Sequence, residues 1–280
     1  MAKAWIIAAA GVLLAGCNTH IDPLTTPSPP PVHQGVQLSP LSKPLKPEEA
    51  DKYFLLVRLH IITLQLPLGA VSDSEELWSY LNEEPINSRN SALPYNGIRV
   101  GVGTESAWPE VAAVLRRFTG QPLGRSQFMI RPGEPLPVAL KQFQPPQTIF
   151  TYRADRTLLG LDYPAGDDVL MTAAAVNLDE PNSVHLAGAL VVRSTAVHPR
   201  YVTGPAGVDM VNQPDYLALP ELDFSLKTPP KGFLLIGPGR QVRRPSSPGQ
   251  QFLVFDRQGL KFESIVVLVP EVFAAPIAPS

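Results

Sequence analysis

Proline is the feature that most restricts the folds open to this chain. Its 280 residues include 32 prolines, whereas the average usage of about 5 % would give about 14. Proline lacks a backbone N–H and fixes φ, so it is excluded from helix interiors and from central strands. The sequence therefore predicts short secondary-structure elements joined by many turns. Because 44 % of the residues are hydrophobic, the chain can still form a substantial core.

The first residues have the organisation of an export signal. Lys3 and the amino terminus provide positive charge, and residues 4–16 are apolar. This run is shorter than the roughly 20 residues that a transmembrane helix needs. It has the length of the apolar region of a secretory signal peptide. Cys17, the single cysteine of the chain, follows directly.

Residues Leu13-Leu14-Ala15-Gly16-Cys17 resemble the lipobox of bacterial lipoproteins. The resemblance implies that the Cys17 thiol takes a diacylglyceryl group, that residues 1–16 are removed as a signal peptide, and that the new amino terminus is acylated. Three acyl chains exceed the two signals that stable membrane anchoring requires. Asn18 stands where enterobacterial lipoproteins retained in the inner membrane tend to have Asp, which favours the outer membrane, facing the periplasm. The alternatives are an ordinary signal peptide with a chance cysteine and a buried helix with a core thiol.

Residues 17–48 are expected to hold the lipidated Cys17 and a Pro-rich tether. Residues 18–48 contain eight prolines and almost no large apolar clusters, so they cannot bury enough surface to offset their ordering entropy. We expect a semi-rigid segment with polyproline-II character, able to reach at most roughly 90 Å. With Cys17 lipidated, no thiol remains for a disulfide, a metal site or a nucleophile.

Residues 49–120 are expected to form a small β-α-β-α segment. The β-branched and aromatic residues of Tyr53–Leu66 predict a long strand that is central in a sheet, and Ile98–Val102 is expected to be the second strand. The Ser-x-x-Glu spacing from Ser72 is that of a capping box and predicts a short helix. A second helix is expected over Trp108–Phe118, capped by Ser106 and followed by Gly120.

Residues 121–275 are expected to be mainly antiparallel β-structure, packed on residues 49–120 as one unit. The fold class is thus α+β. Residues 179–182 have the composition of a hairpin loop. The runs with strand character are Phe128–Arg131, Thr148–Tyr152, Leu158–Tyr163, Val169–Leu178, Val184–Arg193, Gly232–Ile236, Gln251–Phe255 and Phe262–Val269.

The sequence contains no recognisable catalytic, cofactor or metal-binding pattern. Gly101-Val102-Gly103 has the start of a dinucleotide-binding fingerprint, but Ser106 replaces the third glycine and Pro109 follows at once, so packing explains the glycines better. There is no Gly-x-Ser-x-Gly elbow. The formal net charge of −2 gives no reason to expect a nucleic-acid partner.

The remaining polar residues have structural interpretations. None of the five histidines has metal-ligand spacing; His60 and His185 are expected in strands as hydrogen-bonded structural imidazoles. The adjacent carboxylates and the one basic cluster are expected at solvated loop positions. These are Asp167-Asp168, Glu83-Glu84 and the group Arg240, Arg243 and Arg244.

Residues Glu263–Phe273 resemble the closing strand of the secretins, the ring-forming channels of the outer membrane, in which an acidic residue precedes an apolar run that ends near a proline. The resemblance covers 11 of 280 residues. The resemblance implies membership of a larger envelope assembly.

The sequence thus predicts a lipid-anchored cell-envelope protein with a non-catalytic structural or adaptor role through contacts with an envelope protein. The alternatives are a subunit of a secretin-like or pilus-like assembly and a hydrolase whose site only the fold would reveal.

Overall fold

The computed structural model describes residues 39–41, 53–87, 92–177, 180, 183–204, 207–219 and 221–276. All of them lie in the compact unit Val36–Ser280. None of the helices formed by these residues combines the length and the hydrophobicity needed to cross a bilayer.

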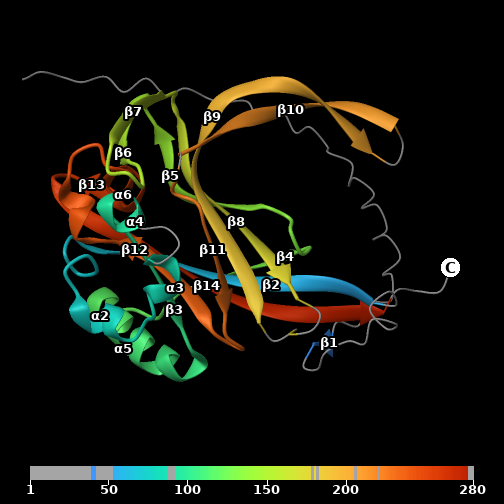
Figure 1. The fold of residues 1–280 in the computed structure, drawn as a ribbon, viewed down its shortest axis with the longest axis horizontal. Coiled ribbons are helices and arrows are strands. Elements are labelled where there is room, and N and C mark those ends of the chain that lie inside the picture. Colours follow the sequence, from blue (N-terminus) through green and yellow to red (C-terminus); the bar gives the residue numbers. More distant parts are fainter. Residues whose placement is uncertain are drawn as a thin grey trace, which may run out of the picture. The chain divides into compact units, whose positions relative to one another are not determined.

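The larger sheet of the described residues, sheet A, is antiparallel and has the order β3-β12-β14-β2-β4 (Figure 1). Two further strands, β1 and β13, pair with β14. The expected long strand is confirmed as β2, and it lies centrally between β14 and β4. The strands are β1 (Ser39–Pro40), β2 (Tyr53–Pro67), β3 (Ile98–Gly103), β4 (Ser126–Ile130), β12 (Phe233–Pro238), β13 (Val254–Arg257) and β14 (Leu260–Pro276).

The second sheet, sheet B, has the order β10-β9-β8-β5, with β11 also paired to β9. The hairpin expected around residues 179–182 is confirmed by the antiparallel pairing of β8 with β9. Strands β6 and β7 form a separate two-stranded sheet. The strands are β5 (Leu136–Gln144), β6 (Gln147–Tyr152), β7 (Leu158–Tyr163), β8 (Gly166–Val176), β9 (Val184–Gly204), β10 (Gly207–Ala218) and β11 (Phe224–Thr228).

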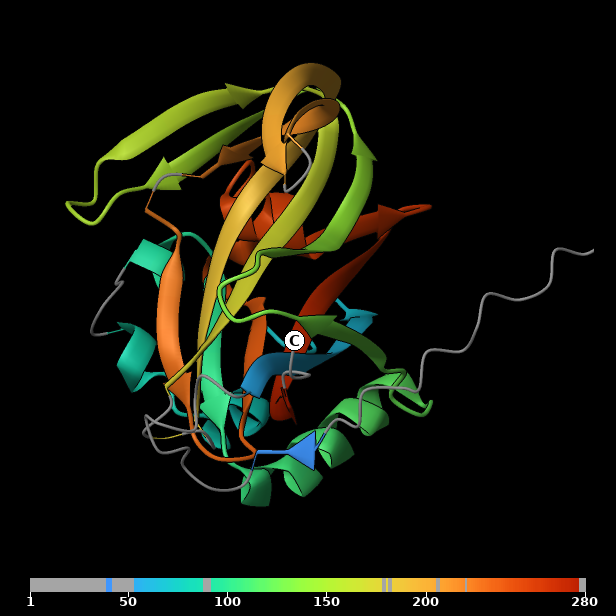
Figure 2. The same cartoon turned by 90° about the vertical axis from the view of Figure 1, so that its right-hand side faces the viewer.

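Sheet A is buried on both faces because apolar residues occupy successive positions of its inner strands. In β12, Leu234 and Ile236 face a core shared with sheet B. Their neighbours Phe233 and Leu235 face a second core with α2 (Glu75–Ser79) and α5 (Trp108–Thr119). Successive strand residues point to opposite faces, so the described residues form three layers: helices, sheet A and sheet B (Figure 2).

The second helix begins at Trp108 as expected, but the N-caps of both helices differ from those expected. The cap of α2 is Ser74, whose side chain accepts the N–H of Leu77, because Ser72 binds Glu263 instead. The cap expected at Ser106 is wrong, because Ser106 lies in a 3-10 turn, η1 (Glu105–Ala107), and Ala107 is the N-cap of α5. Gly120 follows this helix as expected and has a left-handed backbone. The other short helices are α3 (Glu84–Asn87), α4 (Ala92–Tyr95), η2 (Arg240–Arg243) and α6 (Pro248–Leu253).

The fold is a β-rich α+β fold, but the finer β-α-β-α order was not confirmed. The short helices α3 and α4 intervene, and β12 and β14 separate β2 from β3 in sheet A. Four strands were missed: the short β1 and β11, and β5 and β10, which contain Pro137 and Pro214. Both lie at edges of sheet B, where a strand tolerates proline. The strand expected over Gln251–Phe255 is divided between α6 and β13.

Candidate interaction surface

The one site residue that the sequence singles out is Cys17. It lies outside the described residues, as does the rest of the lipobox, so its lipidation stays a prediction. The surface of the folded unit offers further candidates, and the most distinctive one is built by β9 and β10.

The last ten residues of β9 extend beyond the neighbouring strand of sheet B. β8 pairs with β9 only as far as Gly166↔Ser194. From Val197 to Gly204, β9 pairs with β10 over eight residue pairs. Within the described residues, this two-stranded extension has no third strand (Figure 1). We refer to residues 195–204 and 207–215 as the ribbon.

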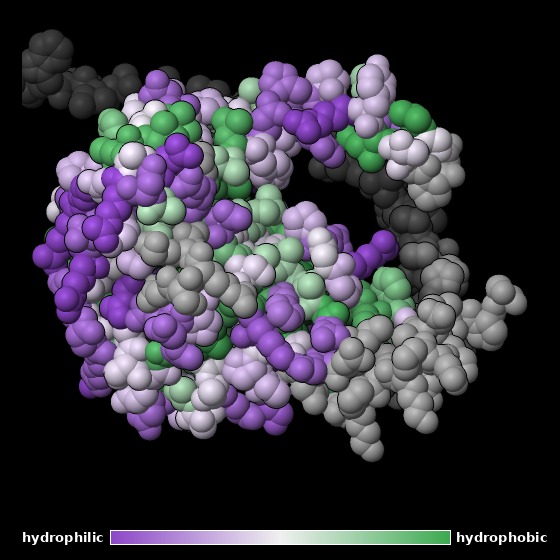
Figure 3. All heavy atoms as spheres, in the orientation of Figure 1, coloured by the Kyte–Doolittle hydropathy of each residue, from purple (hydrophilic) through white to green (hydrophobic). Residues whose placement is uncertain are grey.

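One face of the ribbon is apolar and exposed. Residues that are paired across two antiparallel strands lie on the same face, so Tyr201 lies beside Met210 and Val197 beside Pro214. The side chains of Tyr201, Met210, Val208 and Val197 are 77, 63, 64 and 56 % exposed. The other residues of this face are Pro199, Thr203 and Asn212. None of them carries a charge at neutral pH, and apolar residues gather towards the end of the ribbon in Figure 3.

The opposite face of the ribbon carries its charged residues, beside Val202 and Val211. Arg200 donates to Asp215 at 2.7 Å, and the His198 Nε2 lies 3.4 Å from the same carboxylate. These exposed contacts contribute little stability on their own. They do keep the charges of this part of the ribbon on one side, so the ribbon is amphipathic.

Proline occupies one position on each edge of the ribbon. Pro199 of β9 pairs with Asn212 of β10, and Pro214 of β10 pairs with Val197 of β9. Since proline has no N–H to donate to its partner strand, its nitrogen must face away from the ladder. Each edge therefore lacks one donor that an added strand would need, which disfavours strand addition there.

Phe143 stands near the base of the ribbon and is the most exposed large hydrophobic side chain among the described residues, at 84 %. Its φ of 56° lies in the left-handed region, which bulky residues rarely adopt. The Phe143 N–H donates to Asp167 Oδ1 at 2.8 Å, and Asp167 pairs with Arg193. Although burial raises the pKa of Asp167, the hydrogen bonds from Arg193 and Phe143 outweigh it and lower that pKa.

Asp167 and Asp168 were expected in a solvated loop, and that expectation is wrong. Both lie in β8 and are buried, Asp168 completely. Neighbouring strand residues face opposite sides, so the two carboxylates have different neighbours. Asp167 forms an ion pair with Arg193, and Asp168 lies opposite Lys141 of β5. The loop interpretation failed because β5, which supplies Lys141, was not expected to be a strand.

The environment of Lys141 and Asp168 disfavours both charges. Burial lowers the pKa of Lys141 to about 8, although Asp168 opposes this shift. Burial raises the pKa of Asp168 to about 6, against a hydrogen bond from Gln147 and the charge of Lys141. Gln147 donates to Asp168 Oδ1 at 2.6 Å, while Lys141 donates to the Gln250 carbonyl oxygen at 3.2 Å. Asp168 Oδ2 has no hydrogen-bond partner in the structure. This pair joins β5 and β8 to β6 and α6.

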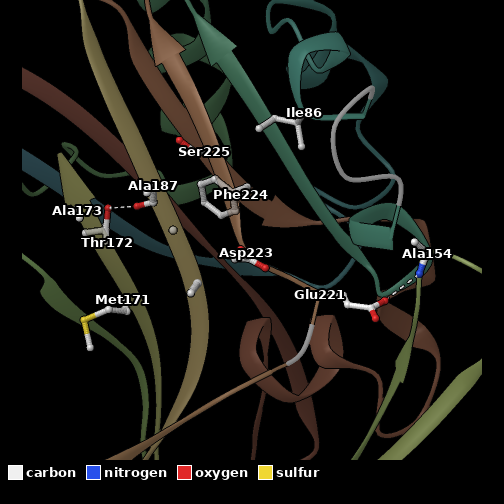
Figure 4. Close-up of a pocket in the computed structure, with 12 residues that line it drawn as sticks. Ile86, Ala154, Met171, Thr172, Ala173, Ala187, Glu221, Asp223, Phe224 and Ser225 are labelled. Atoms are coloured by element: carbon white, nitrogen blue, oxygen red, sulfur yellow. Dashed lines mark hydrogen bonds between the residues drawn. The ribbon is translucent and has the colours of Figure 1, made fainter. Parts of the chain in front are cut away.

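A pocket of about 650 Å³ lies where α3, β8, β9 and β11 meet. Small side chains such as Ala173 and Ala187 line it, and Glu221 lies at one side (Figure 4). The Glu221 carboxylate accepts hydrogen bonds from Arg153 at 2.8 Å and from the Ala154 N–H at 3.0 Å. These bonds lower the pKa of Glu221, the bond from Arg153 most of all. The carboxylate therefore holds the β6–β7 turn.

The glycines of the fingerprint-like segment have the packing role expected of them. A Cβ at Gly101 would approach Leu81 Cβ to 2.8 Å, and one at Gly103 would meet the Phe233 ring at 2.1 Å. The glycines thus allow Leu81 and Phe233 to pack directly against β3.

Most of the other singled-out polar residues form ion pairs. Glu83 pairs with Arg99 at 2.5 Å, whereas Glu84 is exposed. In the basic cluster, Arg240 pairs with Glu75 and Arg243 with Asp73, and Arg244 lies 4.2 Å above the Tyr152 ring.

The histidines are dispersed. His60 and His185 lie in β2 and β9 as expected, and His198 lies in the ribbon. No metal-binding group of three or more His, Cys, Asp or Glu residues occurs in the described part of the chain.

Comparisons with known proteins give no family. No family model matches the sequence, and no curated protein matches it. Among solved structures, the chain is similar to the secretin domain β-barrel of InvG from the Salmonella SPI-1 injectisome NC-base, at 9 % identity and a TM-score of 0.16. The match covers 81 % of this chain and 64 % of that one, so this chain spans less than two thirds of its length. A TM-score this low does not establish a common fold.

Proposed function

We propose that the mature protein is a lipoprotein of the bacterial cell envelope that acts through contacts with another envelope protein and not by catalysis. The lipobox Leu13–Cys17 carries this proposal, because it joins a short apolar run and small residues to the single cysteine of the chain. The acyl chains hold Cys17 in the outer membrane, facing the periplasm. Residues 18–38 set the distance, because the expected tether is shortened by Ser39 and Pro40, which pair with β14 in sheet A. The folded unit presents the contact surface.

Phe143 is the residue that we assign to the protein contact. Aromatic side chains, Phe among them, are enriched in protein interfaces relative to the rest of the surface. The backbone of Phe143 is already fixed by its hydrogen bond to Asp167, so little backbone entropy remains to be lost on binding. A strained backbone that its neighbours hold in place is also typical of functional positions.

Replacing Cys17 with Ser should abolish lipidation. Serine has no thiol for the thioether, so we expect the variant to incorporate no radiolabelled palmitate and to keep its signal peptide. The parent protein should have a mass that corresponds to residues 17–280 plus acyl groups. Cells expressing each form are labelled, and the purified proteins are weighed by intact mass spectrometry. A parent protein with an unmodified cysteine, or one that still begins at Met1, would contradict the anchor.

A photoreactive phenylalanine analogue at position 143 should give one protein adduct of defined mass when cells are irradiated. The matched control carries the same analogue at Phe128, which is 43 % exposed on β4. We expect no adduct from the control, because its backbone is an ordinary strand and its side chain is less exposed. Equal adducts from both positions, or none from position 143, would remove Phe143 from the contact.

A subunit of a multi-copy envelope assembly is the second candidate function. The two unpaired edges of the ribbon within the described residues favour it, since exposed strand edges invite pairing between chains. Pro199 and Pro214 on these edges act against such pairing. The mass of the detergent-solubilised protein distinguishes the two functions, because an assembly predicts an integral multiple of the chain mass.

A further inference from the structure

The ribbon is the surface that the proposed protein contact leaves unexplained. On its apolar face, more than half of the surface of each of four residues is exposed: Tyr201, Met210, Val208 and Val197. Exposed apolar patches on soluble proteins mark contacts with proteins or membranes. The shape of the ribbon decides between these two occupants.

The face is small for a protein interface. Eight residue pairs make a strip about 27 Å long and 10 Å wide, so it covers a few hundred Å². Each partner of a stable protein complex buries about 800 Å². An interface with a second copy of the chain on this face alone would thus be smaller than a stable protein interface. The edge prolines disfavour its enlargement by strand addition.

Binding to a lipid surface requires no such minimum interface area. An amphipathic element with a charged face opposite an apolar face lies in the plane of the membrane interface, with its apolar side at the boundary between headgroups and acyl chains. The ribbon has this polarity, with Arg200, Asp209 and Asp215 on the side opposite Tyr201. Its unpaired edges exclude a deeper position, because unsatisfied backbone groups are too costly in hydrocarbon.

We propose that the apolar face of the ribbon rests on a phospholipid bilayer at this interfacial depth. Tyr201 and Met210, which pair directly across the two strands, form the centre of the contact. The ribbon lies parallel to the membrane and does not cross it.

Because the proposed lipid anchor already holds the protein at the membrane, even a weak contact between the ribbon and the bilayer would be occupied. This argument rests on the proposed function. Residues 18–38 could extend over roughly 65 Å as a polyproline-II segment. A compact unit of this size has a radius of gyration of roughly 18 Å, so the tether lets any of its faces reach the bilayer. Tethering makes the second contact intramolecular, with an effective concentration that can reach the millimolar range.

Charge plays little part in this contact. The ribbon contains one arginine and two aspartates, so anionic lipids offer it no attraction. We expect neutral and anionic bilayers to bind it to a similar extent, with little dependence on salt. This separates the ribbon from the basic elements that recognise anionic membranes through their Lys and Arg side chains.

Flotation with phosphatidylcholine vesicles tests the ribbon without the anchor. The protein is residues 17–280 with Cys17→Ser, which has no acyl chains. We expect it to float with the vesicles, and the double variant Tyr201→Asp/Met210→Asp to lower the partition coefficient at least tenfold. Both side chains are exposed, so the fold should persist, which far-UV circular dichroism checks. The milder Tyr201→Ser/Met210→Ser replaces this variant if it does not fold.

Leu260→Asp is the matched control, because Leu260 is 65 % exposed but lies at the turn between β13 and β14. Its partition coefficient should stay within twofold of the parent. Absence of flotation of the parent, or equal flotation of the ribbon variant, would overturn the proposal. A parent that is dimeric in solution and becomes monomeric in the ribbon variant would also overturn it and would assign the face to a second copy. Lipidation is measured separately by intact mass, so failure of the anchor is distinguished from failure of the ribbon.

Discussion

Replacing Glu263 with Leu is expected to lower the free energy of unfolding by about 4 kcal/mol, because three buried donors lose their acceptor and each such group costs about 1–3 kcal/mol. The carboxylate is fully buried. It accepts the N–H of Val71 at 2.9 Å, the N–H of Ser72 at 3.1 Å and the hydroxyl of Ser72. Glu263 thereby fixes the turn that leads from β2 to α2. Urea denaturation of parent and variant measures the loss.

Two variants test the cause of this loss. Glu263→Gln keeps one carbonyl oxygen and should lose about half as much. Glu271→Leu is the control on the same strand, because Glu271 is 48 % exposed and contacts Arg58 and His60 from outside the core. Its loss should stay below about 1 kcal/mol, as for other exposed ion pairs. Equal losses at residues 263 and 271 would contradict the role of buried hydrogen bonds.

Replacing the pair Lys141 and Asp168 with Met and Leu is expected to raise the free energy of unfolding at pH 7. Buried ion pairs are often no more stabilising than apolar residues of similar size, and their replacement yields about 1–4 kcal/mol in favourable cases. The pKa of Lys141 is lowered to about 8 and that of Asp168 is raised to about 6. Both charges are therefore disfavoured by the folded state at neutral pH.

The same shifts predict two pH windows in the parent protein. Between pH 3.8 and about 6, Asp168 holds its proton only when folded, so the free energy of unfolding falls as the pH rises. Between about 8 and 10.5, Lys141 holds its proton only when unfolded, so the free energy of unfolding rises with pH. The pair opposes folding most between about pH 6 and 8.

Urea denaturation across this pH range separates the variants. The double variant Lys141→Met/Asp168→Leu should lack both windows, since it lacks both titrating groups. Each single variant should be less stable than the double variant at pH 7, because it leaves one buried charge without its counterion. A double variant less stable than both single variants would show that the pair stabilises the fold.

The central strands could be predicted because their signals are local. Tyr53–Pro67 and Ile98–Gly103 are runs of β-branched and apolar residues, and Gly120 ends α5 through its own left-handed backbone. These features depend on neighbours in sequence.

The ribbon and the buried charges could not be predicted because their causes are distant in sequence. Residues 195–218, which include Pro199 and Pro214, were not among the runs expected to form strands, yet each of these prolines lies where its missing N–H faces an unpaired edge. The alternation of apolar residues in 197–203 and 208–214 is the signal that could have revealed the ribbon. Asp168 is buried because Lys141 lies opposite in another strand, and no local pattern shows that pairing.

The position of β14 in sheet A has a consequence for how the chain is made. This last strand pairs with β2 along its whole length from Phe262 to Pro276 and also with β12. Because non-local pairing must wait for both partners, the nascent chain cannot complete sheet A until residues 260–276 have left the ribosome. A polypeptide that must remain extended for passage through a narrow translocation pore benefits from this delay, since premature folding would block its transit.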